Sequence, residues 1–248
     1  MSFIKYFIQF LIIFFLFIIY KILGLKISSN FSSILLKIFG PLFRSKKLIQ
    51  ENILKAFPQI NSKDLSKLRN NMWGNYGRIL SEYVFLKDFR ESKFDNHLEI
   101  IGLDILSKIK KEGKPVIFVS GHFNNFELMA MQIEKSGINL AVIYRPLNNK
   151  FLNHIMEKIR KRYICKNQIK KGLAGTKHIL SFFKKNHSIA LMIDQRVSQG
   201  IKSNFFKHGA YTTTIPAQFA KKFKCNIVPI YIERFNKINF KLTVNKPL

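Results

Sequence analysis

The stretch VIFVSGHFNNFELMAMQIEKSG, residues 116–137, decides the fold that we expect for this chain. Residues 116–120 are apolar or small and rich in β-branched side chains, which is typical of a buried strand. The segment that begins at Asn124 has a helical pattern, so a helix should follow the strand after a short turn. A strand that passes almost directly into a helix is the unit from which α/β proteins with parallel sheets are built.

The same alternation continues to the end of the sequence. Strand-like runs lie at residues 140–144, 188–193, 226–232 and 239–244, and helical runs lie at 150–164 and 214–223. Upstream, Asn61 and Ser62 offer an N-cap to a helix that should reach about Phe89. This pattern predicts a mixed, largely parallel central sheet flanked by helices, with its last two strands as an antiparallel pair.

Composition narrows the class of protein. The chain has 248 residues, 47% of them apolar, which is enough to bury one sizeable core. It carries 42 Lys and Arg against 14 Asp and Glu, a net charge of +28, which favours anionic partners without separating nucleic acid, an anionic membrane or an acidic protein. Cys165 and Cys225 stand alone, without the spacing of a disulfide framework or a zinc site.

The N-terminus predicts a membrane anchor. Residues 6–20 carry no charge and lie between Lys5 and Lys21. As a helix they span about 22 Å, and about 34 Å over residues 3–25 if both lysines extend toward the headgroups, which is enough to cross a bilayer or to embed deeply. The segment has no signal-peptide cleavage pattern, and its faces are all apolar, unlike those of an amphipathic core helix.

The orientation of this anchor follows from charge. Lysines and arginines are frequent just after the apolar run, so the positive-inside rule places the rest of the chain in the cytoplasm. We therefore expect residues 1–26 to form a transmembrane anchor and residues 27–248 to form one domain on the cytoplasmic side. Two cysteines without a pairing pattern agree with a reducing compartment.

A histidine and an acid flank the turn after the strand at 116–120. His122 lies in this turn and Glu127 in the first turn of the helix, for which Asn124 or Asn125 can provide the cap. A carboxylate that folds back onto the imidazole would orient it and leave the second ring nitrogen free as a general base. The sequence offers no convincing nucleophile beside His122, so the base would act on a hydroxyl of the substrate.

Two other strands end in polar side chains. Arg145 follows the strand at 140–144, and Asp194, Gln195 and Arg196 follow the strand at 188–193. Chemistry in parallel sheets gathers at the carboxyl ends of the strands, so these side chains should meet His122 at one edge of the sheet. Each one alone is as readily a solvated turn residue; their convergence makes the case for a site.

Taken together, these segments resemble the HxxxxD/E acyltransferases of glycerolipids, and most closely the late acyltransferases of lipid A biosynthesis, the HtrB-like lauroyl and myristoyl transferases. The resemblance covers nearly the whole chain and rests on an ordered set of motifs: GHFNNFE (121–127), YRPLNN (144–149), IDQR (193–196), NFFKHGAYTT (204–213) and AQFAKKFKCNIVPIYIER (217–234). Arg196 and Val197 depart from the pattern, in which an acid or Lys and an aromatic residue are common. The resemblance also implies a further C-terminal segment beyond Leu248.

The resemblance implies a function. A fatty acyl group would pass from acyl carrier protein to a hydroxyl of a Kdo-linked lipid A precursor at the cytoplasmic face of the inner membrane, with no metal or other cofactor. His122 would be the general base and Glu127 its orienter. The residues implied for shaping the site or contacting substrate are Asn124, Arg145, Asp194, Gln195 and Arg196. Eight basic residues within 150–171 would receive the acidic carrier protein or lipid phosphates.

Two alternatives remain open at this point. A phospholipid or other glycolipid acyltransferase would share His122 and Glu127 without needing the residues that follow the other two strands. A membrane-tethered basic protein that binds anionic lipid or nucleic acid would need only the net charge of +28. We expect lipid partners and no nucleic acid. The sequence gives neither the acyl length nor the oligomeric state.

Overall fold

The computed structural model describes residues 2–195, 197 and 200–248. It contains a seven-stranded sheet in the order β1-β9-β8-β2-β5-β3-β4 and a separate hairpin of β6 and β7. The strands are β1 (Leu98–Ile101), β2 (Ile117–Ser120), β3 (Leu140–Tyr144), β4 (Asn167–Lys170), β5 (Ser188–Met192), β6 (Ile201–Phe205), β7 (His208–Thr212), β8 (Ile227–Phe235) and β9 (Asn239–Val244).

Helices precede and connect these strands. They are α1 (Ser2–Phe39), α2 (Lys46–Ala56), α3 (Ser62–Glu82), α4 (Leu86–Arg90), α5 (Leu103–Glu112), α6 (Glu127–Lys135), α7 (Lys150–Ile159), α8 (Leu173–Lys184) and α9 (Ile215–Phe223). Short helical turns lie at Gly40–Leu42, Tyr83–Phe85 and Asp95–His97, and a π-helical turn at Arg160–Ile164 continues α7.

The topology confirms the predicted fold class. Strands β8, β2, β5, β3 and β4 run parallel, and β8 pairs with β9 in antiparallel fashion, as the pattern of the last two strands predicted. Strands β1 and β4 and the β6–β7 hairpin were not predicted from the sequence. The helix capped by Asn61 ends at Glu82 rather than near Phe89, because the chain passes through a tighter turn into the short α4.

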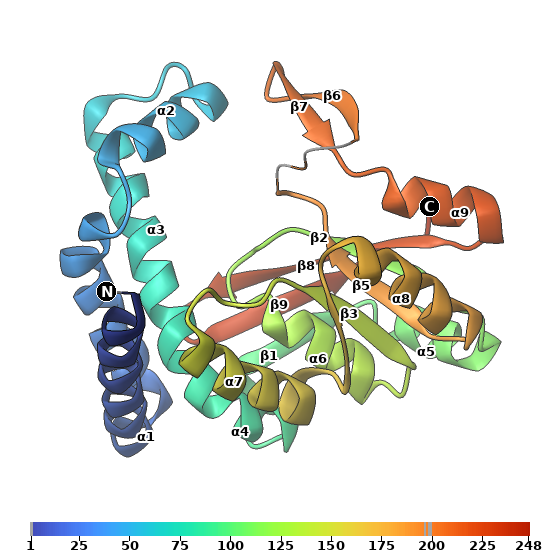
Figure 1. The fold of residues 1–248 in the computed structure, drawn as a ribbon, viewed down its shortest axis with the longest axis horizontal. Helices are drawn as coiled ribbons and strands as arrows, with labels where there is room; N and C mark the ends of the chain where they lie inside the picture. Colours follow the sequence, from blue (N-terminus) through green and yellow to red (C-terminus); the bar gives the residue numbers. More distant parts are fainter. Residues whose placement is uncertain (1, 196, 198–199) are drawn as a thin grey trace.

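Successive side chains of β2 point to opposite faces of the sheet, and each face has its own hydrophobic core. Phe118 points into the larger core, which includes Leu128 of α6, and Ile117 points into the smaller one, which includes Ile179 of α8 and Phe219 of α9. In Figure 1, α4 and α6 accordingly lie on one side of the sheet and α8 on the other. With both faces covered, the strand ends are where side chains remain accessible.

Helices α1, α2 and α3 form a column beside the sheet domain (Figure 1). Helix α1 is not straight, because Gly24 interrupts it with a non-helical backbone. The residues after this turn pack along α3, where Gly77 approaches the backbone of Ser32 closely. The predicted boundary between anchor and domain, after residue 26, falls just past the turn and stays a prediction.

Candidate active site

Strand register places His122 beside Asp194. Strands β2 and β5 are parallel neighbours, and Ser120 is the register partner of Met192. His122 and Asp194 each lie two residues beyond these partners, so the two side chains leave the sheet at the same level. Adjacent strands are about 4.8 Å apart, a separation that two side chains readily bridge.

The His122 imidazole and the Asp194 carboxylate form a close pair. His122 Nδ1 lies 2.8 Å from Asp194 Oδ1, and the backbone N–H of His122 donates to Asp194 Oδ2, also at 2.8 Å. The second hydrogen bond fixes the carboxylate relative to the backbone from which the imidazole extends. About a third of each side chain is exposed, which leaves the imidazole accessible to a substrate.

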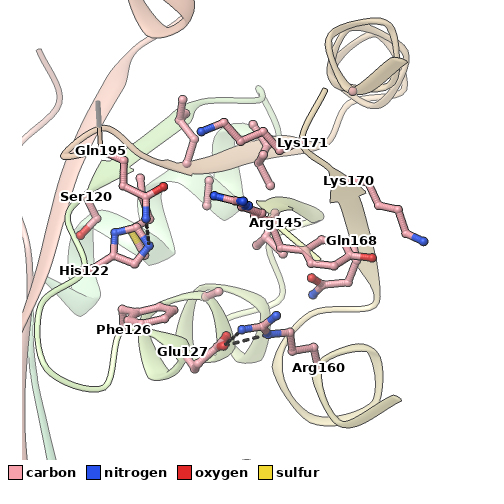
Figure 2. A pocket seen from close by; sticks show the side chains of 18 of the residues that line it. Ser120, His122, Phe126, Glu127, Arg145, Arg160, Gln168, Lys170, Lys171 and Gln195 are labelled. Carbon is pink, nitrogen blue, oxygen red and sulfur yellow. Dashed lines mark hydrogen bonds and ion pairs between the residues drawn. The ribbon is translucent and has the colours of Figure 1, made fainter. Parts of the chain in front are cut away.

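The other ring nitrogen of His122 faces a cavity. Its Nε2 lies 3.4 Å from the side-chain amide nitrogen of Gln195, and Figure 2 shows Gln195 pointing toward the imidazole. When Nδ1 carries the proton and its N–H donates a hydrogen bond to Asp194, Nε2 is unprotonated and can accept a proton. The arrangement therefore holds a histidine whose free nitrogen can take a proton from a bound group.

Glu127 and His122 are not hydrogen-bonded to each other in the described structure, which corrects the predicted hydrogen bond between them. It is buried at the start of α6, where it accepts hydrogen bonds from Arg160 Nε at 2.8 Å and Arg160 Nη2 at 2.6 Å. The Tyr83 hydroxyl donates to the same carboxylate. Burial raises the pKa of Glu127, and the Arg160 guanidinium acts in the opposite direction.

The two asparagines after His122 do not cap α6, which is a second correction. The Asn124 side chain donates to the carbonyl oxygen of Ile232 at 3.2 Å, and its φ of 41° turns the backbone sharply before the helix. The Asn125 side chain is fully buried and donates to Glu82 at 2.9 Å. Both asparagines thus hold the loop against neighbouring elements instead of satisfying the N-terminal amides of the helix.

A buried ion pair lies behind this loop. Glu82 at the end of α3 is fully buried and pairs with Arg234 of β8, whose Nη2 donates to it at 3.0 Å. Burial raises the pKa of Glu82, and Arg234 lowers it. Glu82 and Tyr83 were not predicted from the sequence, because nothing in the local sequence distinguishes them from their neighbours. Arg160 was predicted only as one of eight basic residues within 150–171, and Arg234 only as the last residue of a motif.

The cavity beside His122 measures about 990 Å³ and has two kinds of wall. Its deeper part is apolar and lies between the sheet and α6, with Phe118, Met129, Ile133, Val142, Ala190 and Ile230 among the lining residues. Its rim is polar and basic. In Figure 2, Arg145, Lys170 and Lys171 lie across the cavity from His122, and Glu127 and Arg160 meet to the right of Phe126.

The structure thus brings several predicted site residues to one sheet edge. His122, Arg145 and Gln195 line the cavity, and Asp194 holds His122 from behind. Arg196 lies outside the described residues. Ser120 donates to the carbonyl oxygen of Gly121 and does not form a hydrogen bond with His122.

No group of three or more His, Cys, Asp or Glu in the described part of the chain is arranged to hold a metal ion. The predicted absence of a cofactor stays a prediction.

Comparison with known proteins decides the family. The sequence model described as "Bacterial lipid A biosynthesis acyltransferase" matches residues 1–248. The chain belongs to the bacterial lipid A biosynthesis acyltransferase family. This assignment confirms the resemblance inferred from the ordered motifs. It also agrees with the observed fold, in which the motifs at 121–127, 144–149 and 193–196 follow the carboxyl ends of three neighbouring strands.

Two curated relatives within the lipid A acyltransferases show the extent of the similarity. A lipid A biosynthesis acyltransferase of Haemophilus influenzae is 22% identical over 191 residues, which are 75% of this chain and 58% of the relative. A lipid A biosynthesis palmitoleoyltransferase of Escherichia coli is 23% identical over 152 residues, 61% of this chain and 48% of the relative. The chain thus spans about half the length of the curated relatives it matches.

Proposed function

We infer that this chain carries the catalytic site of an O-acyltransferase that moves a fatty acyl group from acyl carrier protein to a hydroxyl of a Kdo-linked lipid A precursor. One observation carries the proposal. An imidazole fixed through Nδ1 by Asp194 presents Nε2 to a cavity that is apolar at depth and basic at its rim. The reaction needs both properties, because its donor carries a fatty acyl chain and its acceptor is anionic.

In the proposed mechanism His122 acts as the general base. Its Nε2 takes the proton from the acceptor hydroxyl while the hydroxyl oxygen attacks the thioester carbonyl. The tetrahedral intermediate then collapses, the carbon–sulfur bond breaks, and the thiolate leaves with the proton that His122 returns. Asp194 stabilises the imidazolium that forms in between and keeps the ring in the productive tautomer.

The cavity walls fit the two substrates. The apolar depth between the sheet and α6 suits the hydrocarbon chain, which gains free energy as it leaves water. Arg145, Lys170 and Lys171 at the rim suit phosphate or carboxylate groups of the acceptor, because cationic donors bind such anions strongly. Backbone amides near Asn124 remain the predicted donors to the developing oxyanion.

Glu127 has a different role in this proposal from the one that its spacing to His122 suggested. Its carboxylate is engaged by Arg160 and Tyr83 and lies in the cavity wall rather than behind the imidazole. It therefore acts as a positioning residue. The pair it forms with Arg160 ties the start of α6 to the turn that follows α7 and so fixes one wall of the cavity.

The location that we propose follows from the same substrates. The family acts on lipid A, and one stretch of the described residues, Phe3–Leu42, is long and apolar enough to cross a membrane. We place the protein at the inner membrane with its sheet domain on the cytoplasmic side, where acyl carrier protein is available. Basic residues of α7 and the turn after it would receive the acidic carrier protein.

Acyl transfer by membranes that contain the protein tests this function. Acyl carrier protein thioesters of several chain lengths are offered with lipid A precursor, glycerol 3-phosphate or lysophosphatidate as acceptor. We expect transfer to the lipid A precursor, abolished by His122→Ala and retained by His178→Ala, which changes an exposed histidine of α8 outside the cavity. Transfer to a glycerolipid alone would favour a phospholipid acyltransferase, and transfer that survives His122→Ala would contradict the mechanism.

A further inference from the structure

Helix α1 folds back on itself at Gly24. This glycine has φ 75° and ψ 168°, a conformation that essentially only glycine adopts. The Tyr20 hydroxyl donates to Ser32 Oγ at 2.9 Å, although residues twelve apart on a straight helix are about 18 Å apart. The chain therefore forms a hairpin of two arms, residues 2–23 and 25–39, which overlap in the view of Figure 1.

The second arm buries hydroxyl side chains and exposes a stripe of apolar ones, the opposite of an amphipathic helix in water. Its four serines are buried, no more than 3% exposed, whereas four of its large apolar side chains are 41–62% exposed and form one stripe at helical spacing; Leu25 alone of the large apolar residues is buried, and Leu35 and Leu36 are half-buried. The serines are Ser28, Ser29, Ser32 and Ser33, and the stripe consists of Ile27, Phe31, Ile34 and Ile38.

The inward face of this arm is closely packed. Ser32 Oγ donates to the carbonyl oxygen of Gly77, and Arg78 Nη1 donates to Ser29 Oγ at 2.9 Å. Small residues that let helix backbones approach, with hydrogen bonds between the helices, are characteristic of packing within membranes. A helix that buries its hydroxyls and exposes isoleucine and phenylalanine is suited to lipid on its outer side.

The sheet domain holds the first arm near both of its ends. The Asn149 side chain donates to the Tyr6 carbonyl oxygen at 2.8 Å, and the Lys21 ammonium lies 2.9 Å from Asp88 Oδ2. Asn149 and Asp88 belong to the same packed domain. If the first arm crossed the bilayer, these two residues would lie toward opposite membrane surfaces and part of the charged domain would enter the hydrocarbon, which is very costly.

Charge indicates the partner of the exposed apolar surface. Lys26 and Lys37 lie on the second arm, and Arg44, Lys46 and Lys47 follow it closely along the chain. Cations that lie close along the chain to an exposed apolar surface suit a membrane whose headgroups are anionic. The occupant of this surface is therefore one leaflet of an anionic membrane.

We propose that the α1 hairpin lies along one leaflet of the membrane, on the side of the sheet domain and with both arms close to the headgroups, instead of crossing the bilayer. The predicted transmembrane anchor thus becomes a monotopic one. This inference rests on the membrane location given under the proposed function and not on acyl transfer. It places the N-terminal end of α1 and the sheet domain on the same side of the membrane.

Cysteine labelling tests the topology. Single cysteines are introduced as Lys5→Cys in the first arm and as Lys111→Cys in α5, both at exposed positions, in a Cys225→Ser background that retains the buried Cys165. A membrane-impermeant maleimide is applied to cells with a permeabilised outer membrane and to inverted inner-membrane vesicles. We expect both cysteines to react in vesicles, to within about twofold, and neither to react in the cells.

Two results would overturn the proposal. Labelling of Lys5→Cys in the cells, with Lys111→Cys labelled only in vesicles, would show that the first arm crosses the bilayer. Recovery of the wild-type chain in the soluble fraction after carbonate extraction would show that the hairpin is not embedded in a leaflet. Neither result depends on acyl transfer, which is measured separately on the same membranes, so failure of the topology and failure of the proposed function are distinguished.

A cross-link tests the fold of the hairpin. A short bismaleimide that reacts first at the exposed Phe31→Cys should reach Tyr20→Cys in membranes, because the two rings lie 6.4 Å apart. Residues eleven apart on a straight helix would be about 16 Å apart. Gly24→Ala should lower this yield at least about fivefold, since no atom lies within 4 Å of the added Cβ and only the backbone conformation is affected. Gly113→Ala is the matched control, because Gly113 has φ 64°, equal free space and a place far from α1 along the chain. Absence of the cross-link, or equal yields in both variants, would refute the hairpin.

Discussion

Asp194→Asn should abolish most of the activity while leaving the fold intact. The asparagine oxygen can still accept the backbone N–H of His122, but its NH₂ group then faces Nδ1, where Asp194 Oδ1 now lies at 2.8 Å. An amide donor at this position favours the tautomer with the proton on Nε2, which cannot act as a base. In a comparable histidine–aspartate pair the same change lowers kcat by about 10⁴-fold, or about 5.4 kcal/mol in activation free energy.

The cost in stability should be small. About a third of each side chain in the pair is exposed, so water screens the interaction and its loss should lower the free energy of unfolding by no more than about 1 kcal/mol. Acyl transfer under saturating substrate gives kcat, and thermal unfolding in detergent checks the fold. An Asp194→Asn enzyme that keeps more than a tenth of wild-type kcat would refute the role of Asp194 as the residue that orients the imidazole.

Three other predictions concern the packing around the site. Arg160→Met leaves the Glu127 carboxylate buried without its cation and should lower the free energy of unfolding by about 3–5 kcal/mol. Adding Glu127→Leu should restore most of this lost stability. A thermal melt of Arg160→Met that matches the wild type would contradict the pairing. Gly77→Ala places a Cβ 2.1 Å from the Ser32 carbonyl oxygen and should cost about 1–3 kcal/mol in the same assay, so unchanged stability would disprove this close approach. Burial raises the pKa of the Cys165 thiol to about 12, so only about one thiol in 10⁴ is ionised at pH 8. Iodoacetamide should therefore modify Cys165 only after the protein unfolds. Rapid labelling of the native protein would be inconsistent with this burial.

Local pattern predicted the sheet and the edge on which the site lies. Apolar runs that end in His122, Arg145 and Asp194 are visible in the sequence, and parallel strands necessarily bring their carboxyl ends to one edge. The strand order adds what the pattern lacks. Strand β5 lies between β2 and β3, so Asp194 comes next to His122 and Arg145 lies one strand farther along the edge.

The partners of the acids depended on information that is not local. Asp194 is 72 residues from His122 along the chain and comes next to it only because their strands pair in a particular register. Glu127 is five residues from His122 and was therefore predicted to orient the imidazole. The helical geometry of α6 instead directs Glu127 toward Arg160, which comes from the turn after another helix. Closeness along the sequence was therefore a poor guide to which carboxylate lies beside the imidazole.

The turn at Gly24 shows the same limit. An apolar run this long is typical of a helix that crosses a membrane, and composition alone does not reveal a fold back at one glycine. The signal lay in the second arm, where four serines alternate with isoleucine and phenylalanine in a pattern that is meaningful only once the outer and inner faces are known.

The buried pair between Glu82 and Arg234 connects the α1 hairpin to the loop of His122. Glu82 ends the helix against which the second arm of α1 packs, and it also accepts a hydrogen bond from Asn125, three residues after His122. When the hairpin rests at a set depth in one leaflet, this rigid connection sets the height of the imidazole above the lipid. The protein would then acylate only those hydroxyls that an anchored lipid presents at that height. Chemically equal hydroxyls that lie deeper in the membrane or extend farther into water would not be acylated.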